Sequence, residues 1–508
     1  MIPYLDELPP EIYDGILTHV PRGERQQTTL SLTRAIPRSP VPLRHLFECI
    51  RLKSAESVVH LYCRLRGRLE EPRWVNGFSL ETWSVDADVV VNLVNLLPRL
   101  SRITLFVGSD FAPEHMEEIL EKPREALSYI SLLCREQLII SFSRWEGSAC
   151  TGVLVANSGK QGAYFDTALV ALARWPTANY PTLSIVQDPL DAEMAHKHHF
   201  AQPLVFFRLD AIHTLACSPY LRSLTNLRLR IPSRQVASFI YSSPRSIPGL
   251  QILDLSTCNV RLTDVEALAA RFQQLTHLII DECNITRGDA EGEWSNVGKI
   301  CALATVKAAK EREKKLKAWL EARAVRSSPD PEVATVPEEE VTPARRARPG
   351  RRGLAIATIS LRDPPTRMTM PVIRTNIVVP KVRIVPSSPT LRSLSATTSA
   401  LHKDKHDAIR AQFKRGWEEG LAQLTATRSR LSQSWRNGTR MMRIAGDQGV
   451  EEGFDGLEDV DGEGAFYGRD AIRNPWPVPV LCLAGAGPNS VQHVDRCGHA
   501  AASCVYDI

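Results

Sequence analysis

Five cysteine and histidine residues near the C-terminal end of the sequence have side chains that could bind a metal ion. They are Cys482, His493, Cys497, His499 and Cys504. Structural zinc ions in proteins are held by four such ligands, most often in pairs at short, regular spacings. These five could supply four zinc ligands. Their spacing matches no standard zinc finger, so the sequence assigns no metal to them.

A second group of potential metal ligands lies in the middle of the chain. It consists of His196, His198 and His199 together with Asp191 and Glu193. These residues fall in a long insertion between two predicted strands. Because sets of true ligands are rare among such residues, surface histidines are the interpretation that the pattern favours.

Sequence motifs of common enzyme classes are missing. The sequence contains no Gly-x-Ser-x-Gly, His-Glu-x-x-His or Gly-x-Gly-x-x-Gly. Gly159-Lys160 follows an apolar run, as in a phosphate-binding loop, but Gln161 replaces the Ser or Thr that would bind magnesium. We therefore predict a protein that is not an enzyme and that uses no cofactor.

The elements that would position any site are predicted by an apolar pattern that recurs after 25 residues. Leu250, Leu253, Leu255, Cys258 and Val260 recur as Leu275, Leu278, Ile280, Cys283 and Ile285. This spacing and period are typical of leucine-rich repeats. One such unit cannot bury its own apolar face, whereas stacked units share a core and present a long surface to a partner. The pattern therefore indicates a binding protein.

Weaker copies of the same spacing extend the pattern toward the N-terminus. Their apolar triplets are Leu224/Leu227/Leu229, Tyr180/Leu183/Ile185, Leu127/Ile130/Leu132, Leu100/Ile103/Leu105, Val75/Phe78/Leu80 and Phe47/Ile50/Leu52. Between the triplets the apolar period changes from 2 to 3.6, which indicates alternating strands and helices. Any α/β protein alternates in this way, but the shared register favours repeats. We therefore predict an α/β fold in which an irregular leucine-rich-repeat solenoid spans residues 47–288.

A short amphipathic helix is predicted close to the start of the chain. Residues 5–21 read LDELPPEIYDGILTHVP. Pro9 suits a helix start, where a missing N–H group costs nothing. Ile12, Ile16 and Leu17 would form an apolar face that so short a helix cannot bury alone. This face is therefore expected to contact another part of the chain or a partner.

The same stretch resembles the start of an F-box, since it carries Leu-Pro-x-Glu-Ile followed by Ile-Leu. The resemblance covers about the first 45 residues and lacks the Trp-bearing third segment of that family. An F-box followed by degenerate repeats is similar to fungal F-box proteins. The resemblance implies that Leu8, Pro9, Ile12, Ile16 and Leu17 dock the Skp-type adaptor of a cullin–RING (SCF-type) ubiquitin ligase.

Composition is compatible with a protein of the cytoplasm or nucleus. The 508 residues carry a net charge of +5, which is too small to imply nucleic-acid binding by itself. The eleven cysteines include no Cys-x-x-Cys pair, which suits a reducing compartment. We expect no signal peptide, because acidic residues lie where one would begin, and no membrane-spanning segment.

A change in composition near residue 290 separates the predicted repeats from the rest of the chain. The predicted segments are an F-box-like helical domain at 1–46, the solenoid at 47–288, a charged helix at 289–326, a disordered basic and proline-rich linker at 327–400, an amphipathic helix at 401–437 and a disordered tail at 438–508. The C-terminal region is thus predicted to be largely disordered with isolated helices. Gly416 and Gly420 are expected to weaken the 401–437 helix.

These features lead to one main hypothesis and two alternatives. The main hypothesis is a non-catalytic substrate-recognition subunit of a cullin–RING ubiquitin ligase, whose target protein the sequence does not identify. One alternative is a protein-interaction scaffold without a ligase role, which binds partners through 47–288 or 407–435. The other is a nuclear protein associated with nucleic acid through the five arginines of 343–352.

Overall fold

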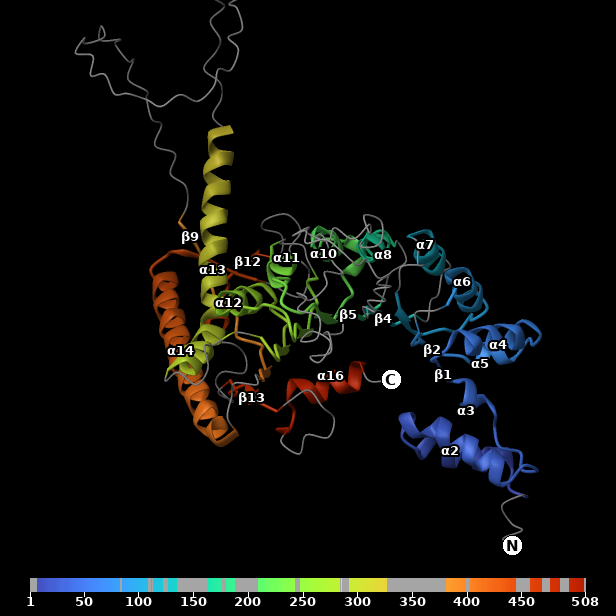
Figure 1. Cartoon of the computed structure of the whole chain (residues 1–508). Coiled ribbons are helices and arrows are strands. Elements are labelled where there is room, and N and C mark those ends of the chain that lie inside the picture. The colour runs from blue at the N-terminus through green and yellow to red at the C-terminus, as the bar shows by residue number, and fades with distance from the viewer. Residues whose placement is uncertain are drawn as a thin grey trace, which may run out of the picture.

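One long parallel β-sheet forms the centre of the computed structural model (Figure 1). Ten strands lie in the order β1-β2-β3-β4-β5-β6-β7-β8-β10-β13, and every neighbouring pair is parallel. The structure describes residues 7–82, 85–107, 111, 113–121, 127–134, 163–175, 180–187, 209–242, 247–283, 285, 292–326, 381–397, 403–444, 457–467, 476–484 and 493–506.

Short strands alternate with helices along most of the described chain. The strands of the long sheet are β1 (Cys49–Leu52), β2 (Gly77–Leu80), β3 (Arg102–Phe106), β4 (Tyr129–Cys134), β5 (Thr182–Gln187), β6 (Asn226–Arg230), β7 (Ile252–Asp254), β8 (His277–Ile279), β10 (Ser393–Ser395) and β13 (Val480–Cys482). The helices that connect its first eight strands are α4 (Ala55–Arg66), α5 (Glu71–Trp74), α6 (Ala87–Asn95), α7 (Pro113–Glu121), α8 (Ala163–Arg174), α10 (Asp210–Ala216), η1 (Pro219–Leu221), α11 (Ala237–Tyr241) and α12 (Leu262–Arg271).

The remaining elements lie at the two ends of the chain. They are α1 (Pro10–His19), α2 (Arg22–Ala35) and α3 (Arg44–Phe47) before the sheet, and α13 (Glu293–Arg326), β9 (Val382–Ile384), η2 (Lys403–Lys405), α14 (His406–Arg436), β11 (Arg440–Ile444), β12 (Leu457–Asp459), α15 (Gly464–Tyr467) and α16 (Gly498–Tyr506) after β8. A second sheet has the order β12-β11-β9. None of the described helices combines the length and the apolar character needed to cross a lipid bilayer.

The strand register stacks apolar side chains into rows that form the core. One row runs through all ten strands: Ile50, Phe78, Ile103, Ile130, Leu183, Leu227, Leu253, Leu278, Leu394 and Leu481. Every member is buried. Full burial of one such side chain stabilises a fold by roughly 1.5–3 kcal/mol, so the row is a main source of stability.

Helices cover both faces of this sheet. The helices between the strands line one face, and α16 lies against the other (Figure 1). Tyr506 and Ala502 of α16 pack there on Tyr129, Ile252 and Ile279 from three different strands. The last described helix of the chain therefore closes part of the face that the connecting helices leave open.

The α/β class predicted from the sequence is confirmed, but the predicted leucine-rich-repeat solenoid is wrong. The structure has a ten-stranded parallel sheet with alternating helices, and residues beyond 380 supply two of its strands. The physical reason is that a strand and a helix together occupy about the length of one leucine-rich repeat. Any parallel α/β sheet whose strands follow chain order shows the same spacing, so the period alone does not distinguish the two folds.

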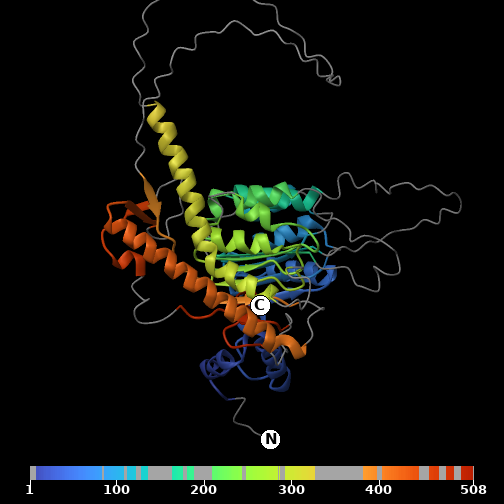
Figure 2. The same ribbon diagram turned by 90° about the vertical axis from the view of Figure 1, so that its left-hand side faces the viewer.

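The prediction of a largely disordered C-terminal region with isolated helices is also wrong for the residues that the structure describes. Strands β10 and β13 extend the long sheet, and α16 packs on it. The two long helices α13 and α14 cross and pack against one another (Figure 2). Of the predicted linker at 327–400, residues 327–380 and 398–400 lie outside the described residues, whereas strands β9 and β10 lie within it.

A buried ion cluster lies beneath α16. The Asp254 carboxylate, with no exposed surface, accepts hydrogen bonds from Arg228 Nε at 3.0 Å and from an Arg230 terminal nitrogen at 2.6 Å. Ser256 Oγ donates to the same carboxylate at 2.7 Å, and the Arg228 guanidinium lies over the Tyr506 ring. Burial alone would raise the pKa of Asp254, but Arg230 and Arg228 lower it below the ordinary 3.8.

Asp254→Asn should therefore destabilise the fold. Removing one partner of a buried ion pair leaves the other charge uncompensated and costs roughly 3 kcal/mol. In the unchanged protein, ionised Asp254 contributes its full stabilisation above pH 3.8, because its pKa is lower in the folded state than in the unfolded state. This stabilisation is lost as pH falls through the lowered pKa of the folded state. Urea unfolding at neutral pH measures the loss. Asp459→Asn, which removes an exposed partner of Arg440, is the control. An unchanged unfolding midpoint for Asp254→Asn would contradict the role given to the cluster.

Glycines at the contact between α13 and α14 let the two helix backbones approach closely. A Cβ atom at Gly416 would lie 1.8 Å from the Ser295 carbonyl oxygen, and one at Gly298 would lie 2.2 Å from the Phe413 carbonyl oxygen. A Cβ atom at Gly420 would meet the Cβ of Ala302 at 2.6 Å. These glycines therefore weaken the isolated helix but permit the packing of the pair.

Gly416→Ala separates these two effects. Helix propensity alone predicts a gain of about 1 kcal/mol, whereas the clash with Ser295 predicts a loss of about 1–3 kcal/mol or more. We expect the loss to exceed the gain and the thermal unfolding midpoint to fall. Gly462→Ala is the control, because a Cβ atom there meets nothing within 4 Å. A rise in the midpoint for Gly416→Ala would show that the helices are not in close contact.

Candidate functional site

The three N-terminal helices form a small module with its own core. Tyr13 and Leu17 of α1 pack on Val41, and Leu8 and Leu32 contribute partly buried side chains. The module lies next to β1, the first strand of the long sheet, on the outside of the molecule (Figure 1). It therefore presents its outer surface away from the sheet.

Helix α1 has two apolar faces with different environments. It begins after Pro9, with Pro10 in its first turn, and it ends at His19, since Val20 has an extended backbone conformation. Successive residues on an α-helix are rotated by about 100°, so an i, i+4 pair shares one face and the next pair lies beside it. Tyr13 and Leu17 point into the module, where they are 1% and 0% exposed.

The second apolar face of α1 points to solvent. Ile12 is 49% exposed and Ile16 is 50% exposed. Leu43, the residue before α3, is 47% exposed. Among the described residues, these three are half of the large apolar side chains that stand out from the surface, the others being Val59, Leu69 and Trp319. Ile12 and Ile16 lie one helical turn apart, the spacing of the apolar anchors on helices that dock into a partner's groove.

Charged groups fix α1 against α3. The Asp14 carboxylate contacts the Arg44 guanidinium and lies 2.6 Å from Nε2 of the buried His45. Arg25 of α2 pairs with Glu48, just after α3, at 3.3 Å. The hydrogen bonds from Arg44 and His45 hold the pKa of Asp14 below its ordinary value of 3.8. These contacts orient α1 so that Ile12 and Ile16 remain on the outside.

The five residues predicted to dock an adaptor fall into different environments. Pro9, Ile12 and Ile16 are exposed, whereas Leu8 is half-buried and Leu17 is fully buried. We therefore assign Leu17 to the core that supports the surface rather than to the surface itself. The exposed Leu43 was outside the sequence prediction. The signal that could have suggested it is its place between Pro42 and the start of α3.

The structure describes one of the two predicted groups of potential metal ligands but not the other. The group at 191–199 lies outside the described residues. At the C-terminal end, Cys482, His493, Cys497 and His499 offer ligand atoms that all lie within 4.8 Å of one another. Cys504 is exposed and does not belong to this group. The group is adjacent to β13, at the opposite end of the long sheet from α1.

A basic cavity of about 500 Å³ lies between α13 and β9. Lys310, Lys314, Lys317 and Lys381 line it, and Arg383 is paired with Glu313 at 3.0 Å. Its charge would favour an acidic ligand. Among the described residues, its lining supplies no pair of groups suited to nucleophilic catalysis.

Comparison with models of known protein families finds no match for this chain, and comparison with curated protein sequences finds none either. The residues themselves are therefore the basis for a functional proposal.

Asp14→Asn should loosen α1 from α3. The carboxylate is partly exposed, so we expect a modest loss of about 1 kcal/mol. Because its folded pKa is lowered, this contribution is present above pH 3.8 and is lost as pH falls through the lowered value. Amide hydrogen exchange over 10–19 measures the change at neutral pH. Glu11→Gln, at an exposed position on the same helix, is the control. Equal exchange in Asp14→Asn and the unchanged protein would contradict this role.

Proposed function

We propose that this chain is a non-catalytic substrate-recognition subunit of a cullin–RING ubiquitin ligase. It would bind a Skp-type adaptor through α1 and its surroundings, and a target protein through another part of the chain. The protein would then act by proximity, since holding a target near a charged ubiquitin-conjugating enzyme raises the effective concentration of the target lysine. The cytoplasm or nucleus is where such a complex would work.

The exposure of Ile12 and Ile16 is the observation that carries this proposal. Both side chains lie on the helix that resembles the start of an F-box, and the small core of Tyr13, Leu17 and Val41 holds that helix in place. Burial of the exposed half of each isoleucine against a partner would contribute roughly 1 kcal/mol. Pro9 is exposed at the start of the same helix and would extend the contact.

The adaptor contact is tested by the double variant Ile12→Asp/Ile16→Asp. The two substitutions would remove the apolar contact, and the new carboxylates would lose their hydration in the complex. Adaptor binding should therefore fall at least about 100-fold. The fold should survive, because both side chains are already half exposed. Pulldown of a purified Skp-type adaptor by the full chain, with an established F-box protein as positive control, is the measurement.

Val59→Asp/Leu69→Asp is the matched control for this variant. Val59 and Leu69 are apolar residues, 45% and 92% exposed, that lie outside the three-helix module. The control should bind the adaptor as the unchanged chain does. Loss of binding in both double variants would mean a general effect of surface charge. Failure of the unchanged chain to recover adaptor would reject the ligase role and favour an interaction scaffold.

A further inference from the structure

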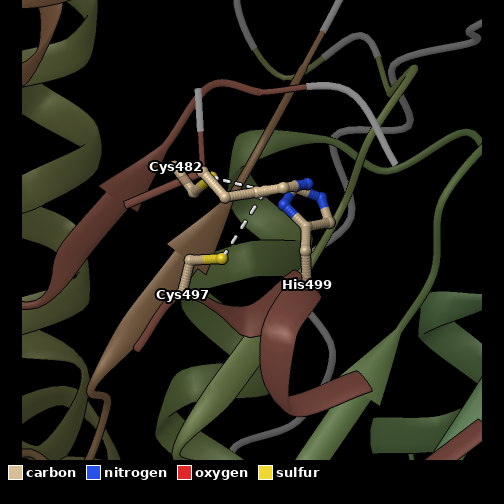
Figure 3. A group of neighbouring side chains, drawn as sticks. Cys482, Cys497 and His499 are labelled. Carbon is tan, nitrogen blue, oxygen red and sulfur yellow. Dashed lines mark hydrogen bonds between the residues drawn. The ribbon is translucent and has the colours of Figure 1, made fainter. Parts of the chain in front are cut away.

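Four side chains from the C-terminal end of the chain converge on one point. Cys482 is the last residue of β13, Cys497 directly precedes α16, and His499 lies in the first turn of α16 (Figure 3). His493 lies in the connection between the two elements. Both cysteines and His499 are buried, and neither cysteine is joined in a disulfide.

The separations between these ligand atoms fit a tetrahedral metal ion. Cys482 Sγ and Cys497 Sγ each lie 3.7 Å from Nδ1 of His493. In a tetrahedral zinc site with bonds of about 2.3 Å to sulfur and 2.05 Å to nitrogen, neighbouring sulfur and nitrogen ligands lie about 3.6 Å apart. These two distances agree with this value, and all four ligand atoms lie within 4.8 Å of one another, so a modest movement of the side chains would let them share one ion.

His499 is oriented so that one ring nitrogen remains for a metal. Its Nε2 lies 2.6 Å from the buried Asp281 carboxylate, while its Nδ1 is buried and makes no hydrogen bond. A histidine that binds a metal through one nitrogen almost always donates the other N–H to a carboxylate, a backbone carbonyl or water. Asp281 is itself fixed, because its other oxygen accepts from the Thr397 backbone N–H at 2.9 Å. This arrangement is what a ligand histidine requires.

The backbone brings the start of α16 directly onto the sheet. Arg496 has φ +62°, a left-handed conformation that turns the chain just before Cys497. A Cβ atom at Gly498 would lie 2.9 Å from Ser395 Oγ and 3.1 Å from Ile279 Cγ1. Glycine at this position therefore allows the contact that places Cys497 and His499 beside Cys482.

We propose that Cys482, His493, Cys497 and His499 bind one Zn²⁺ ion in a closed, structural site. Two thiolates and two imidazoles form a ligand set that suits tetrahedral zinc. Four protein ligands leave no position for water or substrate, so the ion would not be catalytic. It would join β13 to α16 and thereby hold α16 over the face of the sheet that contains Asp254. This inference is independent of the adaptor contact.

Metal analysis of the full chain tests the site directly. Protein produced with zinc and purified without chelator should carry about one zinc ion per chain, measured by mass spectrometry of the metal. After replacement of zinc by Co²⁺, the absorption spectrum should show the bands of tetrahedral cobalt and of thiolate-to-cobalt charge transfer. Folded, unchanged protein that holds no zinc and gives no such cobalt spectrum would overturn the proposal.

Two variants and a control assign the metal to these residues. Cys482→Ser/Cys497→Ser should lose the zinc, whereas Cys504→Ser, which removes an exposed cysteine of α16 outside the group, should keep it. Asp281→Asn should weaken zinc binding by about 10–100-fold, because it removes the carboxylate that orients His499. Full zinc retention in the double cysteine variant would also overturn the proposal. Because the cobalt spectrum uses the unchanged chain, poor folding of a variant does not decide the outcome.

Discussion

The parallel pairing of β10 with β8 is the contact on which the later half of the structure depends. It joins residues 277–279 to residues 393–395, and backbone hydrogen bonds from Arg392 N to Thr276 O at 2.7 Å and from Ile280 N to Ser395 O at 2.8 Å flank it. Strand β13 then pairs with β10. Without this pairing, β13 would have no edge on which to bind.

That pairing also sets the position of the two long helices. Helix α13 follows β8, and α14 follows β10, so the return of the chain to the sheet brings the helices together. Their close approach at Gly416 and Gly298 is therefore part of the same arrangement. The buried Trp294 and Trp417 add a large apolar contribution to the pair.

The two proposed sites lie at opposite ends of the sheet and depend on it differently. The N-terminal module has its own core around Tyr13 and Leu17, and it is joined to the main core through Phe47 of α3. The Cys/His group instead exists only because β13 and α16 are both seated on the sheet, beside Asp281. Adaptor binding and zinc binding are therefore expected to respond to different substitutions.

Local periodicity in the sequence was sufficient to place the first eight strands. Pairs such as Ile103/Leu105 and Leu253/Leu255 are buried because alternate residues along each strand face the connecting helices. The same period could not separate a solenoid from another parallel α/β sheet, because both repeat a strand and a helix. Strands β10 and β13 were missed because each pairs with a segment far away in sequence and lies outside the register that the first eight strands share.

For the site residues too, local spacing in the sequence predicted some features, whereas contacts between distant segments decided the others. Ile12 and Ile16 were predicted from a helical spacing, and their exposure agrees with a face that the chain alone does not bury. The spacing that named Leu17 could not tell that it packs on Val41, since that contact depends on the path of α2 and α3. The Cys/His group has no standard spacing because a strand, a connection and a helix each supply part of it.

The proposed contact between α1 and a Skp-type adaptor can be followed by amide hydrogen exchange of the full chain with and without purified adaptor. If α1 binds the adaptor, exchange over residues 10–19 should slow when the adaptor is added, with little change in the strands of the sheet. Unchanged exchange over 10–19, at adaptor concentrations that protect an established F-box protein, would contradict it.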